Sequence, residues 1–212
     1  MTTPFVARAR PAARPTDLDN TSREAAGLSF VAAGAVFLLA TTLAASIAPG
    51  YDIHGGAISD LGVIAETAWL FNGSLLAIAA LNLVGGWLFF REHRRAWVLA
   101  AFVLGSIGAL GAGLFPLDTG GLHAIFALAA FVGFNLEALA TALVVRGPIR
   151  WLSALAGVVG LVYVVVMVIG DGGNPAVFGA IGHGGAERMI AFPAMLWLLA
   201  LGGGLMAGRA SR

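Results

Sequence analysis

The chain has 212 residues, of which 59% are hydrophobic and only 11% are charged, and its mean hydropathy is +0.90. A soluble domain carries about twice that charged fraction, so the composition indicates an integral membrane protein. The absence of cysteine excludes disulfides, thiolate metal sites and cysteine nucleophiles. The net charge of +1 gives no sign of a nucleic-acid partner, and we expect membrane lipids to be the partners instead.

The first 26 residues are rich in arginine and proline and poor in apolar side chains. This composition predicts a disordered cytoplasmic tail over residues 1–26. The apolar run that follows is too long for a signal peptide. Residues 209–212 would form a second, very short cytoplasmic tail.

Six apolar runs are long enough to cross a bilayer, which takes about 20 residues of helix. They lie near residues 27–48, 67–90, 96–116, 123–145, 151–170 and 188–208. Several runs are rich in glycine, which lets helices approach one another closely in a bilayer. We therefore expect an all-α integral membrane protein, with a bundle of six transmembrane helices over residues 27–208.

Arginine is concentrated on one side of this bundle. Every arginine except Arg188 falls on the side of the two termini: Arg8, Arg10, Arg14, Arg23, Arg91, Arg94, Arg95, Arg146, Arg150, Arg209 and Arg212. Positive charge is retained in the cytoplasm when a membrane protein inserts. The pattern predicts a multi-pass protein of the cell membrane with a cytoplasmic N-terminus and a cytoplasmic C-terminus.

The opposite face gathers glycine-rich segments that carry polar groups. They read "HGGAISDLG", "PLDTGGLH", "GDGGNP" and "GHGGAER". We expect residues 55–64 to form a re-entrant or short-helical connection that turns Asp60 towards a polar pocket. The pocket would bind a lipid head group or a small polar ligand. Its candidate residues are Ser59, Asp60, Asn72, Asp118, His123, His183, Glu187 and Arg188, with Glu137 deeper in the bundle.

A zinc site is one alternative for this face. His123 and His183 would supply nitrogen ligands, and Asp60, or alternatively Asp118 or Glu187, would supply oxygen. A catalytic zinc takes three protein ligands and a water, which would make the protein a hydrolase of a lipid substrate. The sequence has no HExxH or similar motif, and carboxylates near helix N-termini also stabilise the helices themselves. The cofactor and the question of enzymatic activity therefore stay open.

Glu137 lies well inside the fourth apolar run. An ionisable residue at that depth is costly unless it is paired or faces water. It would serve a proton-coupled transporter or channel, which a chain this short would form as a homo-oligomer. Alternatively, it would specify helix packing through a polar partner, for which Asn135, Asn82 and Asn72 are the candidates. About 21 Å of helix separates it from His123, so the two side chains cannot share one site.

Four short segments carry a family resemblance. "ISDLGV" followed by "LFNGSLL", "GLFPLD" with His123 after it, and "ERMIAFPAMLW" resemble the bacterial and archaeal membrane family known as domain of unknown function 998. The resemblance implies a six-helix membrane protein and no established reaction. It also implies that polar motifs of the family fall at Asp60, Asp118, His123, Glu187 and Arg188.

Overall fold

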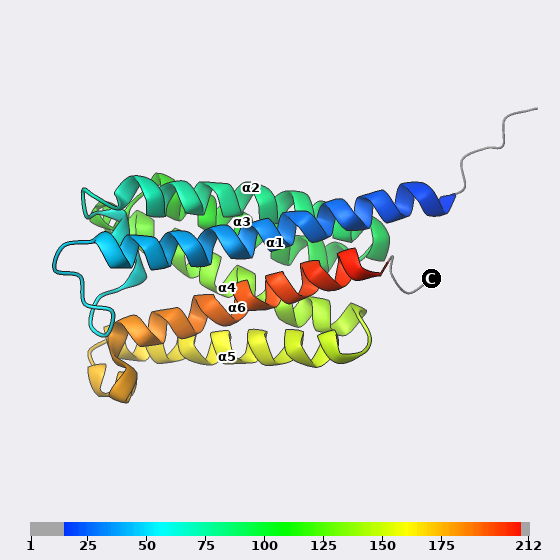
Figure 1. The fold of residues 1–212 in the computed structure, drawn as a ribbon. Coiled ribbons are helices and arrows are strands. Elements are labelled where there is room, and N and C mark those ends of the chain that lie inside the picture. Colours follow the sequence, from blue (N-terminus) through cyan, green and yellow to red (C-terminus); the bar gives the residue numbers. More distant parts are fainter. Residues whose placement is uncertain (1–14, 209–212) are drawn as a thin grey trace, which may run out of the picture.

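The structure, a computed structural model, describes residues 15–208, with side chains from residue 20 onward. All regular structure in that range is helical, and six helices are long and apolar enough to cross a membrane (Figure 1). They are α1 (Pro15–Ile47), α2 (Ala68–His93), α3 (Ala96–Leu114), α4 (Gly121–Val144), α5 (Pro148–Asp171) and α6 (Gly182–Ala207). The predicted all-α fold with six spans is confirmed.

Three short 3₁₀ helices lie in the connections at one end of the bundle. They are η1 (Ile58–Gly62) before α2, η2 (Leu117–Thr119) before α4 and η3 (Pro175–Ile181) before α6. We call this the η end; it is on the left in Figure 1. The opposite end, where α1 begins and α6 ends, is called the terminal end.

The six helices form a closed ring. Each helix packs against the next one along the chain, and α6 packs against α1. Buried aromatic rings fill part of the interior, and the rings of Phe30 and Phe102 stack with centroids 5.4 Å apart. The buried indole of Trp197 donates a hydrogen bond of 2.7 Å to Ser153 Oγ, which ties α6 to α5.

Glycine brings α3 and α4 into very close contact. A Cβ atom on Gly105 would lie 3.2 Å from the backbone nitrogen of Phe134 and 3.3 Å from the carbonyl carbon of Gly133. A larger side chain would force the two helices apart. This is the use of small residues that the glycine-rich runs predict for a bilayer.

Two helix boundaries differ from the sequence prediction. α1 begins at Pro15, so residues 15–26, which we expected in the disordered tail, are helical; residues 1–14 and 209–212 lie outside the described range. Arg23 Nε lies 3.4 Å from Glu92 Oε2, which connects this polar extension to α2. α6 begins at Gly182 rather than near residue 188, because packing at the η end supports the glycine-rich first turns.

Candidate functional site

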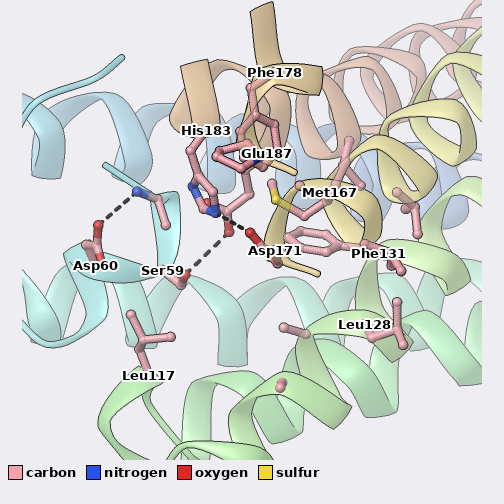
Figure 2. A pocket seen from close by; sticks show the side chains of 18 of the residues that line it. Ser59, Asp60, Leu117, Leu128, Phe131, Met167, Asp171, Phe178, His183 and Glu187 are labelled. Atoms are coloured by element: carbon pink, nitrogen blue, oxygen red, sulfur yellow. Dashed lines mark hydrogen bonds and ion pairs between the residues drawn. The ribbon is translucent and has the colours of Figure 1, made fainter. Parts of the chain in front are cut away.

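A pocket of about 1050 Å³ lies at the η end, among α4, α5, α6 and the α1–α2 connection. Figure 2 shows part of its lining. The polar side chains that line it come from four segments far apart in the sequence. They are His54, Ser59, Asp60, His123, Asp171, His183 and Glu187.

The rest of the pocket is apolar and extends along α4 and α5. In Figure 2, Leu128, Phe131 and Met167 lie beyond the polar group around His183. Phe131 is about 15 Å along α4 from its first residue, which is half the thickness of a hydrocarbon core of about 30 Å. Leu128 and Val168 line the pocket and still expose 47% and 60% of their surface. The apolar end of the pocket therefore reaches the apolar outside of the bundle along α4 and α5.

The connection before α2 is folded by its own carboxylates. Asp52 accepts hydrogen bonds from the backbone N–H groups of His54 at 3.0 Å and Gly55 at 2.9 Å, and these bonds lower the pKa of Asp52. Asp60 Oδ2 accepts from the N–H of Ala57 at 2.8 Å, which caps the start of η1. The expected short helical turn is present, and Asp60 lines the pocket.

Glu187 attaches this connection to α6. Its side chain is only 5% exposed, and its Oε2 accepts a hydrogen bond from the backbone N–H of Ile58. Its Oε1 accepts from Ser59 Oγ at 3.4 Å. A carboxylate from the last helix thus holds η1 at the mouth of the pocket.

Arg188 supports the same connection from outside the pocket. Its Nη1 donates to the carbonyl of Ile53 at 3.0 Å, and its Nη2 donates to the hydroxyl of Tyr51 at 2.7 Å. Burial raises the pKa of the Tyr51 hydroxyl, while the hydrogen bond from Arg188 opposes that rise. Because its guanidinium is used in this way, Arg188 positions the loop and does not line the pocket.

Two of the pocket histidines bind backbone carbonyl groups. His54 Nε2 lies 3.2 Å from the carbonyl oxygen of Ala180, and His123 Nδ1 lies 2.9 Å from that of Phe115. A carbonyl oxygen can only accept, so these ring nitrogens carry the proton and donate. In the neutral ring the other nitrogen of each histidine is then an acceptor.

The third histidine pairs with an acid. His183 Nε2 lies 3.2 Å from Asp171 Oδ1, joining the first turn of α6 to the end of α5. The imidazole also makes an edge contact with the ring of Phe178, with centroids 5.1 Å apart. This pair lies at the centre of the polar group in Figure 2.

The expected zinc ligands are not assembled. Among residues 20–208, no group of three or more histidine, aspartate or glutamate side chains is arranged to hold a metal ion. Asp60 turns back to the backbone of its own loop, and His123 binds a carbonyl with Nδ1. The hypothesis that His123, His183 and Asp60 bind a metal therefore stays a prediction that this arrangement does not support.

Of the nine candidate residues, the structure brings five to the pocket: Ser59, Asp60, His123, His183 and Glu187. The other four lie elsewhere. Asn72 Nδ2 donates to the carbonyl of Gly62 at 2.8 Å and joins η1 to α2. Asp118 is exposed on η2, and Arg188 faces the loop.

Glu137 belongs to a separate polar cluster inside the bundle. Its Oε1 accepts from Asn82 Nδ2 at 2.7 Å, and Asn82 Nδ2 also lies 3.2 Å from Ser106 Oγ. Glu137 and Asn82 are fully buried. Within the described residues, Glu137 Oε2 and Asn82 Oδ1 have no hydrogen-bond partner. Glu137 does not line the large pocket.

Two polar lining residues, His54 and Asp171, were not among the candidates. His54 precedes a glycine pair, and Asp171 ends an apolar run before another glycine pair. A polar residue at such a junction was the available signal. It did not identify partners, because Asp171 meets His183 across η3, and His54 meets Ala180 126 positions away in the sequence.

The fold defines a multi-pass protein with six membrane-spanning helices. The family model described as "Protein of unknown function (DUF998)" matches residues 31–204, and the chain belongs to this family. The resemblance noted in its short motifs is thereby confirmed. No curated protein and no solved structure matches the chain, and the family description assigns no activity.

Proposed function

We propose that this protein of the cell membrane binds an amphiphilic lipid in the pocket at the η end. The head group would lie against the histidines and carboxylates, and the apolar chain would lie between α4 and α5. One observation carries the proposal: a single pocket joins a polar end to an apolar end that is open on the outside of the bundle.

The polar end offers a head group several partners in a small space. Asp171, His183 and Glu187 line it together with Ser59. Ligand sites commonly combine a mainly apolar wall with a few polar groups that fix orientation. The pocket has this composition, and its volume of about 1050 Å³ is at the upper end of the range for such sites, roughly 300–1000 Å³.

The apolar end is accessible to a chain that stays in the bilayer. α5 is the least buried of the six spans, with 28% of its most apolar window buried against 39–56% for the others. Leu128 on α4 and Val168 on α5 line the pocket and are exposed. A lipid could therefore enter sideways without taking its chain through water, which avoids the cost of exposing apolar surface.

Hydrolysis has less support than binding. A catalytic serine is activated by a base within hydrogen-bond reach, most often an imidazole. The hydroxyl of Ser59 instead donates to Glu187, and His183 Nε2 is occupied by Asp171.

The test fills the apolar end and leaves the polar end intact. Ala127 lines the pocket on α4, whereas Ile125 on the same turn is 65% exposed and does not line it. We expect Ala127→Trp to lower the amount of co-purifying lipid about tenfold, equivalent to about 1.4 kcal/mol of affinity. Ile125→Trp is the matched control and should retain the wild-type amount.

Native mass spectrometry of gently solubilised protein would count the bound lipid and give its mass. Thermal unfolding of both variants would establish that the bundle is intact. Equal lipid retention by Ala127→Trp and Ile125→Trp would contradict the proposal.

A further inference from the structure

The hydrogen-bonding groups of the pocket are strongly biased towards acceptors. Three carboxylates line it, from Asp60, Asp171 and Glu187. No arginine is among the residues described as lining it, and the sequence contains no lysine. Ionised carboxylates accept hydrogen bonds and donate none.

The histidines add to this bias. The protonated nitrogens of His54 and His123 already donate to backbone carbonyl groups, and that of His183 donates to Asp171. When such a ring is neutral, its remaining nitrogen is an acceptor. The hydroxyl of Ser59 donates to a carboxylate, which leaves its lone pairs as acceptors too.

Among the described residues, the arginine next to the lining residue Glu187 is already committed. Arg188 donates to the carbonyls of Ile53 and Gly184 and to the hydroxyl of Tyr51. Helix ends do not reverse the balance: α4 and α6 begin at the pocket and α5 ends there, and each end carries only about half an elementary charge, positive at a start and negative at an end. The backbone N–H of Gly184, in the first turn of α6, is also taken, by the carbonyl of His54.

We propose that the pocket selects amphiphiles whose head group carries a protonated amine and rejects anionic head groups. This inference rests on the proposed lipid binding and specifies its ligand class. An ammonium group has three hydrogen-bond donors and a positive charge. Its donors suit the acceptors of the pocket, and its charge suits the carboxylates. A carboxylate or phosphate head group would meet like charge, and a hydroxylated neutral head group would satisfy the acceptors without the charge attraction.

Asp171 is the carboxylate best placed to receive the amine. Its Oδ1 is paired with His183, and its side chain is 56% exposed, so a ligand can reach it. Asp60 and Glu187, by contrast, hold backbone N–H groups of the loop.

The experiment compares three amphiphiles with the same saturated chain: a primary alkylamine, an alkyl carboxylate and a monoacylglycerol. Native mass spectrometry in a non-ionic detergent would give the affinity of the purified full chain for each. We expect the amine to bind about tenfold more tightly than either of the others. Equal or tighter binding of the carboxylate or the monoacylglycerol would overturn the inference.

Asp171→Asn sharpens the test, because it removes the charge and keeps the size. It should lower amine affinity about tenfold and leave monoacylglycerol binding unchanged. Asp118→Asn is the control, since Asp118 is exposed at the same end but does not line the pocket. An equal loss of amine binding in both variants would assign the effect to surface charge and overturn the inference.

Ala127→Trp separates the two proposals. If it abolishes binding of all three amphiphiles and the amine has no advantage, the head-group preference is wrong and lipid binding stands. If it changes none of them, lipid binding in this pocket is itself wrong.

Discussion

The pocket at the η end and the cluster around Glu137 are both polar sites in an apolar bundle, but they are built differently. The carboxylates of Glu187 and Asp60 are satisfied by backbone N–H groups of a loop, and the pocket beside them is open. Glu137 is fully buried, and among the described residues its hydrogen-bond partner is the Asn82 amide alone, in a place where Gly105 lets α3 approach closely. An open site can exchange ligands, whereas a closed one specifies how helices pack.

The largest expected effect comes from the closed cluster. Glu137→Ala removes the nearest acceptor of Asn82 Nδ2 and leaves a cavity, which should lower the free energy of unfolding by about 3 kcal/mol. Glu137→Gln keeps an acceptor oxygen and nearly the same volume, so its loss should be below about 1 kcal/mol. Thermal unfolding in detergent would measure both variants.

Lipid binding provides the control for this comparison. Glu137→Gln should bind the same amount of lipid as the wild type, because Glu137 does not line the pocket. A Glu137→Gln variant that folds normally and loses lipid or gains ion leakage in liposomes would refute the division into an open functional site and a closed structural one.

The sequence predicted the bundle well, since each span is encoded locally by a run of about 20 apolar residues. It also predicted a re-entrant or short-helical connection at residues 55–64, where η1 lies, and it named Asn82 as one of three candidate partners for Glu137. The site itself depends on contacts across the chain. Glu187 meets Ile58 over 129 positions, and no local pattern encodes that distance.

The zinc hypothesis also depended on contacts that a sequence does not reveal. An inventory of histidines and acids on one face was compatible with a metal, but it did not say which way each ring would turn. His123 turns to the carbonyl of Phe115, because a buried imidazole N–H needs an acceptor. The start of α6 at residue 182, rather than near residue 188, was missed because glycine has a low helix propensity. Packing overrides that propensity here.

A smaller, local effect is expected at the open site. Glu187→Ala removes the acceptor of the Ile58 N–H and of Ser59 Oγ. Leaving the buried N–H of Ile58 without its acceptor should cost about 2 kcal/mol, so amide exchange at Ile58 should rise about thirtyfold. Hydrogen-exchange mass spectrometry of residues 55–62 would detect the change.

The control for Glu187→Ala is amide exchange in the rest of the molecule. Exchange within α3 should stay unchanged, because η1 packs mainly against α1, α2 and α6. Uniformly faster exchange across all helices would mean that Glu187 supports the whole fold, and the contrast with Glu137 would disappear.

The smallest effect should come from Asp52, which lies on the exposed part of the same loop. Its folded pKa is lowered by the N–H groups of His54 and Gly55, so its ionised form stabilises the turn above its unfolded pKa of about 3.9. That contribution is lost as the pH falls through the lower folded pKa. The unfolding temperature of wild type should therefore exceed that of Asp52→Asn slightly near neutral pH, and the two should converge in strong acid. A difference that grew on acidification would contradict this assignment, and it would mean that the loop at the pocket mouth is held by Glu187 and Arg188 without help from Asp52.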